Sequence, residues 1–173
     1  PLRLDTMDFT SSLSQLPAPS AKRIALRISA PAERALRQGH PWVFDQSITE
    51  QSHEGAPGDL AVIFDNKRRF LAIGLYDPTS TIRVRVLQSR RPATINAEWF
   101  QNILNLAAQV RESLEGTDTT GYRLVHGEND GFSGLVIDRY DETLVLKLYT
   151  PAWIPHLKEF CDALAQVSPA EHL

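Results

Sequence analysis

The sequence YRLVHGENDGFSGLVIDRY, residues 122–140, decides the fold of the second half of this chain. It contains two short, mainly apolar runs, at residues 123–125 and 135–137, joined by a polar loop. Three glycines lie within eight positions of that loop, at 127, 131 and 134. Glycine reaches backbone angles that a Cβ forbids, so this spacing predicts two strands joined by a compact, sharply turned connection.

The same loop carries the polar residues Glu128, Asn129 and Asp130. It would suit a cation, a partner surface, or Asx turns that satisfy its own backbone. His126, Glu128 and Asp130 alternate, and carboxylates with an imidazole are ligands of divalent cations. The EF-hand pattern fails, however, and an acid–base pair needs shifted pKa values in a cleft. We therefore expect no metal and favour a self-bonded glycine-rich turn.

Helical periodicity flanks this stretch on both sides. An amphipathic helix is expected from an N-cap at Asn96 to near Gly116, and a second from Pro151 to about Val167. Leucines alternate through residues 143–149, which predicts a hairpin with residues 135–140. Residues 93–173 are therefore predicted to form an α+β domain of a helix, about three antiparallel strands and a helix.

The first half has the period of strands rather than helices. Apolar and polar residues alternate or cluster in short runs, and turn residues separate them every 8 to 12 or so positions. One short helix is expected over Pro31–Gln38, capped by Gly39. We predict a small β-barrel over residues 21–92, curled to protect its edges. Strands are expected at residues 21–28, 47–53, 60–64, 70–76 and 82–87.

The remaining segments are connections. Residues 1–20 are rich in Ser, Thr and Pro and are expected to be a flexible leader. Residues 90–94 combine charge with proline and mark a domain boundary. No apolar run approaches the roughly 18 residues that span a bilayer, and no signal peptide is expected, so we expect a cytoplasmic protein without membrane contact. The lone Cys161 excludes an intramolecular disulfide and is expected in the core.

Charge is divided between the two halves. Residues 21–92 have 12 Lys and Arg against 7 Asp and Glu, whereas residues 93–173 have 5 against 12. This asymmetry indicates two modules with different partners, although surface charge can also segregate by chance. A basic module suits a polyanion, whose phosphates bind exposed cations. The candidates are Lys22, Arg23, Arg34, Arg37, Lys67, Arg68, Arg69, Arg83 and Arg85, of which the last two share one face of a strand.

Aromatic residues lie beside one of these cationic segments. The sequence His40-Pro41-Trp42-Val43-Phe44 follows the short helix, and Trp42 and Phe44 point to the same side if the segment is extended. Core packing is the simpler interpretation. Stacking of one ring on a nucleobase is the alternative, and it would add His40 and Trp42 to the RNA-binding set.

Three motifs resemble one family. HPWVF, residues 40–44, after RALRQG, resembles the signature of the amino-terminal PUA domain of bacterial large-subunit ribosomal RNA methyltransferases that make 5-methylcytosine. STIRVRVL, residues 80–87, resembles the closing strand of that domain. Residues 122–140 resemble the central domain, with Phe132 where leucine is usual and Ser133 where proline is usual. By this resemblance, the motif residues of the loop are Arg123, Glu128, Asp130, Gly131, Asp138 and Arg139.

The resemblance implies ribosomal RNA as a partner and S-adenosylmethionine as the cofactor of the parent enzyme. In that family the donor site and the catalytic cysteine lie in a third, carboxy-terminal Rossmann-like domain. No donor loop occurs in this sequence, and Cys161 matches no family motif. We therefore expect that domain to be absent from this chain, which would bind no cofactor, hold no catalytic residue and be inactive alone. A homodimer is left open.

Two functional hypotheses follow from these patterns. The first is an RNA-binding and positioning region of a ribosomal RNA methyltransferase. The second is a protein-interaction adaptor that docks a partner through the acidic half, with the barrel as a scaffold. A hydrolase that uses Glu128 and Asp130 ranks below both.

Overall fold

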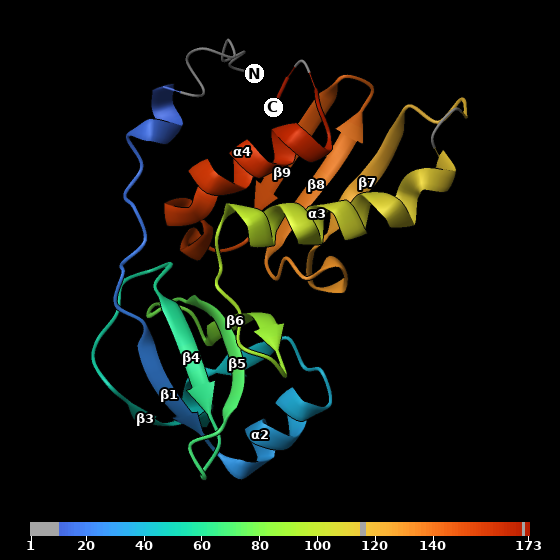
Figure 1. Cartoon of the computed structure of the whole chain (residues 1–173). Helices are drawn as coiled ribbons and strands as arrows, with labels where there is room; N and C mark the ends of the chain where they lie inside the picture. Colours follow the sequence, from blue (N-terminus) through green and yellow to red (C-terminus); the bar gives the residue numbers. More distant parts are fainter. Residues whose placement is uncertain (1–10, 115–116, 171) are drawn as a thin grey trace. The chain divides into compact units, whose positions relative to one another are not determined.

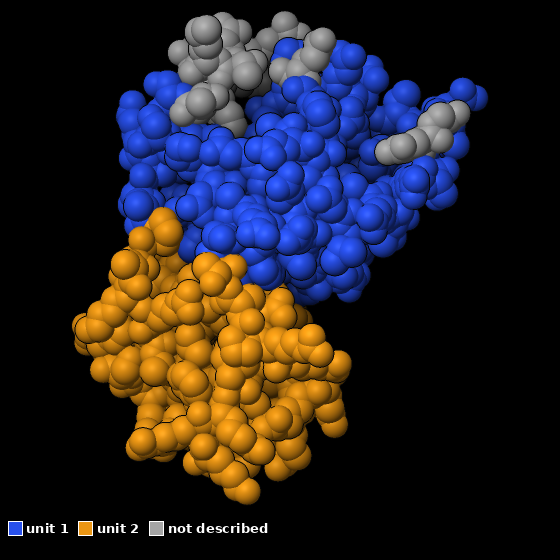
Figure 2. Space-filling model, in the orientation of Figure 1, with its two compact units in different colours: residues 1–18, 95–149, 154–173 blue, residues 19–94, 150–153 orange. Residues whose placement is uncertain are grey.

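The computed structural model describes residues 11–114, 117–170 and 172–173. These residues form two compact units, coloured separately in Figure 2. One unit contains residues 19–94 with 150–153, and the other contains residues 95–149 and 154–173 with the described residues before Pro19. Over the described ranges, no helix has the length and apolarity needed to cross a membrane.

The first unit is a six-stranded sheet with a curled, half-barrel form. Its strand order is β2-β6-β5-β4-β1-β3, so β2 and β3 are the two edges. The pairing is antiparallel except between β1 and β4. The predicted PUA-like fold is confirmed, and the predicted bounds of β4 and β5 match. The strands are β1 (Ile24–Ile28), β2 (Trp42–Phe44), β3 (Ile48–Gln51), β4 (Leu60–Phe64), β5 (Phe70–Tyr76) and β6 (Ile82–Ser89).

A single helix and a short segment from late in the chain complete this unit. Helix α2 (Ala30–Arg37) has a proline in its first turn and buries Leu36. Thr150 Oγ1 donates a 2.8 Å hydrogen bond to Asp77 Oδ2, and Trp153 is fully buried. The pattern of residues 93–173 predicted one continuous second domain and did not indicate that residues 150–153 group with the first unit.

The second unit is a three-stranded antiparallel sheet, β7-β8-β9, with two helices (Figure 1). The predicted α+β arrangement is confirmed. The Asn96 cap is also confirmed, since its Oδ1 accepts from Trp99 N at 2.9 Å. The elements are α3 (Ala97–Arg111), η2 (Glu112–Leu114), β7 (Gly121–His126), η3 (Gly127–Asp130), β8 (Leu135–Tyr140), β9 (Thr143–Leu148), η4 (Pro151–His156) and α4 (Leu157–Val167).

The last helix begins later than predicted. Residues Pro151–His156 form the 3-10 turn η4, and the α-helix starts only at Leu157. Proline has no N–H, so Pro155 cannot donate the bond that would close an α-helical turn onto Pro151. The α-helical hydrogen bonding therefore starts beyond the second proline.

An aromatic cluster forms the core of the second unit. Trp99 and Phe100 of α3 pack edge to face with Phe132 and Phe160, with ring centroids 5.3 to 6.2 Å apart. Phe132, which replaces the usual leucine of the motif, is completely buried. Aromatic pairs in this geometry add to the free energy gained by burial.

Two predictions fall partly outside the described residues. Of the predicted leader, residues 1–10 are not described, while residues 11–14 are helical and Leu13 is buried. The predicted helix end near Gly116 also lies outside the described residues. Before it, α3 ends at Arg111 and continues as the 3-10 turn η2.

Candidate nucleic-acid interface

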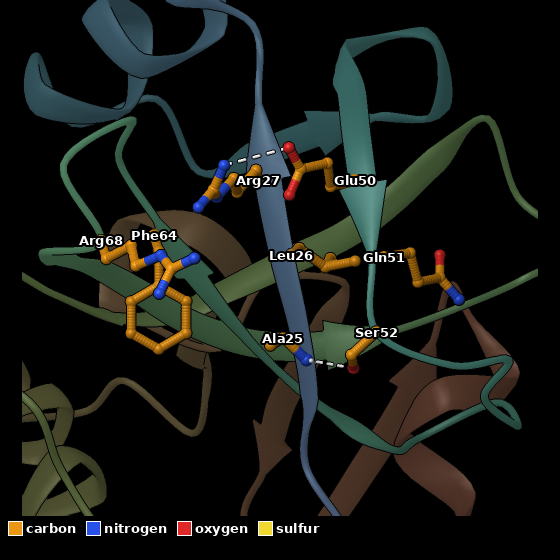
Figure 3. Close-up of a pocket in the computed structure, with 8 residues that line it drawn as sticks. All are labelled: Ala25, Leu26, Arg27, Glu50, Gln51, Ser52, Phe64 and Arg68. Atoms are coloured by element: carbon orange, nitrogen blue, oxygen red, sulfur yellow. Dashed lines mark hydrogen bonds and ion pairs between the residues drawn. The ribbon is translucent and has the colours of Figure 1, made fainter.

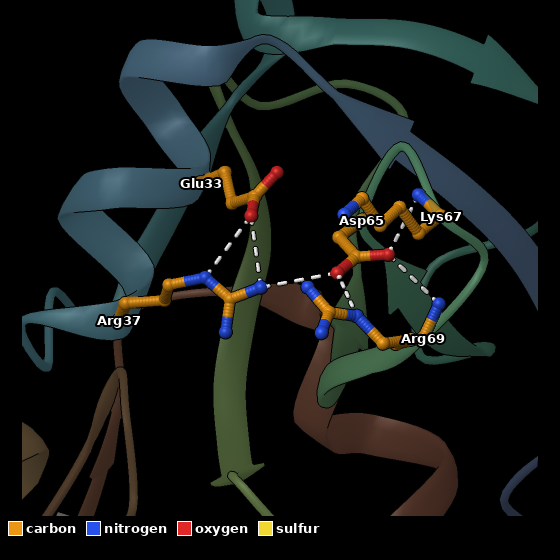
Figure 4. Close-up of polar contacts among 5 residues, drawn as sticks. All are labelled: Glu33, Arg37, Asp65, Lys67 and Arg69. Carbon is orange, nitrogen blue, oxygen red and sulfur yellow. Dashed lines mark hydrogen bonds and ion pairs between the residues drawn. The ribbon is translucent and has the colours of Figure 1, made fainter.

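The turn between β4 and β5 gathers cations around one buried carboxylate, Asp65 (Figure 4). Its Oδ1 accepts from the backbone N–H groups of Lys67 and Arg69, both at 2.8 Å. Its Oδ2 accepts from Arg69 Nε at 2.8 Å and from Arg37 Nη2 at 3.1 Å. Arg37 also donates to Glu33, within α2, at 2.8 and 3.0 Å. One carboxylate thus fixes the turn and joins it to α2.

These hydrogen bonds favour the charged form of Asp65. The backbone N–H of Arg69 is the largest cause, and with the Arg69 guanidinium and the N–H of Lys67 it lowers the pKa of Asp65 despite the opposing effect of burial. Asp65 is therefore ionised at neutral pH. The side chains of Arg37 and Arg69 keep 47% and 66% of their surface exposed, so donors remain available to a ligand.

Arg68 has an unusual backbone in this turn. Its φ is 61°, in the left-handed region that favours glycine. Arg68 N donates to Asp65 O, and Asp65 N donates to Arg69 O, both at 2.9 Å. Hairpin loops of this length place a left-handed residue, classically glycine, before the second strand. The chain holds an exposed arginine there instead.

Arg68 lines a groove of about 370 Å³ on the half-barrel (Figure 3). Ala25 and Phe64 contribute apolar side chains to it, whereas the Leu26 side chain lies in the core and the Gln51 amide is turned to Tyr76 Oη. Arg27 Nη1 and Glu50 Oε1 form an ion pair at 3.0 Å at the same groove. The groove combines an aromatic ring with a cation, which is the composition of a site for a planar, anionic ligand.

A second groove, of about 320 Å³, lies between α2 and the ends of β5 and β6. Arg37 and Arg90 line it together with Leu36 and Phe70. Arg90 also has a left-handed backbone, with φ 69°. Both left-handed arginines of the described residues therefore line a groove that contains a phenylalanine.

The remaining basic candidates differ in exposure. Lys22, Arg23, Arg34 and Lys67 are exposed, as an RNA contact requires. Arg83 is half-buried, and its Nη1 donates to the carbonyl oxygens of Asp77 and Pro78.

Arg85 corrects the prediction that two guanidinium groups project together from β6. It is 7% exposed, in the interior of the first unit. Burial alone would raise the pKa of Asp77, but hydrogen bonds from Thr150 and Thr79 and the charge of Arg85 lower it. The β2–β6 ladder has a register shift at Arg83, so Arg83 and Arg85 do not have equal exposure although they lie two residues apart. Arg85 has a structural place beside Asp77.

His40 and Trp42 lie in a half-buried aromatic group. Their ring centroids are 5.8 Å apart and nearly perpendicular, and Phe44 lies 6.0 Å from His40 and 6.4 Å from Trp42. His40 Nδ1 is 3.0 Å from Trp42 O and 3.3 Å from Trp42 N, so the ring also closes the local backbone turn. This geometry favours packing, and a stacking role stays a prediction.

The glycine-rich loop of the second unit uses its polar groups internally. Asp130 accepts two bonds from Arg111, at 3.0 and 2.6 Å, and a third from His126 N at 2.6 Å. Glu128 Oε1 accepts from Ser133 Oγ at 3.0 Å and Gly134 N at 3.1 Å. These contacts agree with the self-bonded turn, and the part of the chain that the structure describes holds no cluster able to bind a metal.

The other charged residues of the motif are also engaged. Arg123 pairs with Asp138 across β7 and β8 at 2.8 Å, and Arg139 donates to Ser168 Oγ at 2.8 Å. Gly131 has φ 81° directly after η3. The motif therefore has a structural role in this unit, and its assignment as a functional loop stays a prediction.

Cys161 is buried, and burial raises the pKa of its thiol to about 12. A thiol with this pKa is protonated at neutral pH and is a poor nucleophile. The geometry agrees with the expected core position.

Phe64 and Asp65 of this interface were not predicted as site residues. The signal of Phe64 in the sequence is weak, because it ends an ordinary strand pattern. The spacing of Asp65 from Lys67 and Arg69 was a better indication, since an Asx turn caps N–H groups two residues ahead.

Residues 26–89 match the family described as "PUA-like domain". A ribosomal RNA large subunit methyltransferase from Deinococcus radiodurans is 49% identical over 158 residues, which are 88% of this chain and 39% of the relative. Ribosomal RNA large subunit methyltransferase I from Photobacterium profundum is 40% identical over 118 residues, 67% of this chain and 30% of the relative. This chain is similar to the amino-terminal region of the ribosomal RNA large subunit methyltransferases. It spans less than two fifths of the length of these methyltransferases.

Two solved structures share the fold of this chain. A protein from Streptococcus mutans assigned as a SAM-dependent methyltransferase aligns with a TM-score of 0.73 at 20% identity, covering 84% of this chain and 38% of that protein. A second protein, assigned as a methyltransferase and complexed with SAH, aligns with a TM-score of 0.72 at 19% identity, covering 85% and 37%. At these identities the likeness concerns the fold alone.

Proposed function

We propose that this region binds ribosomal RNA and positions it for a methyltransferase domain elsewhere in the full-length protein. The observation that carries the proposal is the cationic turn and its two grooves on a unit that matches the PUA-like family. The unit has 12 Lys and Arg against 7 Asp and Glu over residues 21–92. A folded unit with excess, exposed cations binds phosphates and loses affinity as salt rises.

The finer part of the proposal is the reaction. The relatives are ribosomal RNA large subunit methyltransferases, and the resemblance of residues 122–140 is to enzymes that make 5-methylcytosine. The methyl donor would be S-adenosylmethionine. The described residues do not fit that donor: the glycine-rich loop leads into strand β8, whereas donor and nucleotide loops of Rossmann-like domains lead from a strand into a helix. The donor therefore belongs to a part of the enzyme beyond these residues.

In this proposal, the exposed cations and the two grooves determine the position of the RNA on the first unit. Lys22, Arg23, Arg34, Lys67 and Arg68 contact phosphates, and Arg37 and Arg69 add donors that Asp65 holds in place. Phosphate contacts fix register without reading sequence, so selection of the target base falls to contacts in the grooves and to the methyltransferase domain.

Filter binding tests the proposal directly. The protein is titrated with fragments of large-subunit ribosomal RNA in 50 mM and 200 mM salt. Binding at low salt that weakens by at least tenfold over this range is expected, because each phosphate contact releases counterions. A parallel assay with labelled S-adenosylmethionine is expected to show no methyl transfer. Absence of RNA binding at low salt, or methylation by this chain alone, would overturn the proposal.

A second candidate, a protein-interaction adaptor, has one structural observation in its favour. Tyr140 of β8 and Val145 of β9 are exposed at 56% and 47%, and Tyr149, directly after β9, at 57%. Exposed apolar residues on a sheet face are a common basis of protein interfaces. Capture from lysate with and without RNase separates the two candidates. Partners retained after RNase treatment favour the adaptor, whereas partners lost with the RNA favour RNA binding.

A further inference from the structure

We propose that the groove lined by Ala25, Ser52, Phe64 and Arg68 is a subsite for one unpaired nucleobase of single-stranded RNA, with the adjacent phosphate on Arg68. This inference rests on the proposed RNA binding and goes beyond it by naming the subsite and the form of RNA that it takes. For brevity, we call these four residues the Phe64 groove.

The residues that line the Phe64 groove suit an unpaired nucleotide. Phe64 is half-buried at the end of β4, so part of its ring borders the groove. Successive bases stack on such rings, which is a sequence-tolerant source of affinity. The volume, about 370 Å³, falls in the range of small-molecule sites.

Charge complementarity identifies the ligand as anionic. Figure 3 shows Arg68 and Phe64 together at one side of the groove, apart from the Arg27–Glu50 pair. Arg27 is neutralised by Glu50 at 3.0 Å, whereas no ion pair to Arg68 occurs among the described residues. Lys67 and Arg69 flank it and are exposed. A phosphodiester beside a stacked base satisfies both the ring and the cation, whereas an apolar peptide would leave the guanidinium without a partner.

The backbone of Arg68 is the independent observation. Its φ of 61° is the conformation that a glycine adopts without strain. Side chains held in such conformations occur preferentially at ligand sites. The hydrogen bonds of Asp65 hold the turn whatever residue stands at 68, because they run to backbone and side-chain groups of Lys67, Arg69 and Arg37. The arginine side chain is therefore not needed to form the turn, and we infer that it serves a ligand.

The experiment compares four proteins: the unmodified chain, Arg68→Gly, Phe64→Leu and the control Lys158→Ala. Lys158 is an exposed cation of α4, paired with Asp162, and its loss changes net charge by the same amount as Arg68→Gly. Fluorescence anisotropy is measured with labelled ten-nucleotide oligouridylate and with a duplex RNA of equal length, at 0.1 M salt. Melting temperature is measured for every protein.

Arg68→Gly is expected to bind oligouridylate about fivefold more weakly, because one phosphate contact adds about 0.7 to the slope of affinity against salt. Phe64→Leu is expected to lose about tenfold through the missing stack. Neither change should reduce duplex binding as much, since duplex bases are not free to enter the groove. Arg68→Gly should melt at the same or a higher temperature, which separates lost binding from lost folding.

The outcomes distinguish failure of the proposed RNA binding from failure of the proposed nucleotide subsite. If the unmodified protein binds neither RNA, the proposed function fails. If it binds RNA but Arg68→Gly and Lys158→Ala bind oligouridylate equally well, the Phe64 groove is not a nucleotide subsite. Equal losses of Arg68→Gly on duplex and single strand would also overturn the subsite, because they would indicate a phosphate contact without base recognition.

Discussion

The β4–β5 turn of the first unit and the glycine-rich loop of the second unit have the same central device. In each, one carboxylate accepts backbone N–H groups and an arginine at once: Asp65 from Lys67 N, Arg69 N and two guanidinium groups, and Asp130 from His126 N and Arg111. A carboxylate in this position replaces several hydrogen bonds that a tight turn cannot make with itself.

The two turns differ in what occupies the left-handed positions and in where the cations lie. The loop places glycines there, at 131 and 134, and its Arg111 side chain is only 14% exposed. The turn places Arg68 there, and its Arg69 side chain is 66% exposed. The glycine-rich loop therefore has a structural role and encloses its charged groups, whereas the β4–β5 turn exposes its charged groups to solvent. The same device encloses charge in one unit and exposes it in the other, as the proposed RNA binding requires.

The largest effect should come from removing the carboxylate of the enclosed loop. Asp130→Ala leaves Arg111 and His126 N without their partner in a site where the Asp130 side chain is 10% exposed. Breaking such a pair costs about 3 kcal/mol. Urea unfolding followed by circular dichroism should show this loss. Asp162→Ala, which removes an exposed pair with Lys158, is the matched control and should change stability by less than about 1 kcal/mol. Equal losses from both variants would contradict the structural role of Asp130.

Acid should act on the exposed turn through Asp65. The pKa of Asp65 is below its ordinary value of 3.8, chiefly because of the Arg69 N–H, so the folded state favours the ionised form. The stability from this preference is fully present above about pH 5 and is lost as pH falls through 3.8 and below. Asp77 acts in the same direction. Melting temperatures from pH 6 to pH 3 should fall less steeply for Asp65→Asn than for the unmodified chain. An identical pH profile for the two proteins would show that Asp65 is not linked to folding.

The sequence predicted some features of the two turns and of their units but not others, for physical reasons. Strand bounds such as Leu60–Phe64 follow from local alternation between turn residues, and the loop with its self-bonded carboxylates follows from glycine spacing. The exposure of cations does not follow from alternation, because the register of β6 against β2 shifts at Arg83, and Arg85 is buried while Arg83 stays half-exposed. The return of residues 150–153 to the first unit depends on a long-range bond from Thr150 to Asp77, for which no local pattern exists.

Replacing Gly131 by alanine should have an intermediate effect on the free energy of unfolding. Gly131 has φ 81°, and an added Cβ would lie 3.3 Å from Ile103 Cγ2, so both backbone and packing oppose it. A left-handed conformation costs a non-glycine residue about 1–2 kcal/mol. Gly131→Ala should lower the free energy of unfolding by about this amount. Gly39→Ala is the control for packing, since φ is 95° there but nothing lies within 4 Å of an added Cβ. A smaller loss at Gly131 than at Gly39 would contradict the contribution of Ile103.

The smallest effect, and the opposite sign, is expected where the exposed turn departs from the glycine rule. Arg68→Gly removes the left-handed strain at φ 61°, which is worth about 1–2 kcal/mol. It also gives the unfolded chain more freedom, which costs about 0.5–1 kcal/mol. The net result should be a gain of about 0.5–1 kcal/mol in the free energy of unfolding, measured in urea at pH 7. Arg68→Asn should gain a similar amount or less, because asparagine tolerates the left-handed region better than arginine but less well than glycine. A loss of stability in Arg68→Gly would show that the arginine side chain supports the turn itself, and the contrast between a binding turn and a structural loop would then fail.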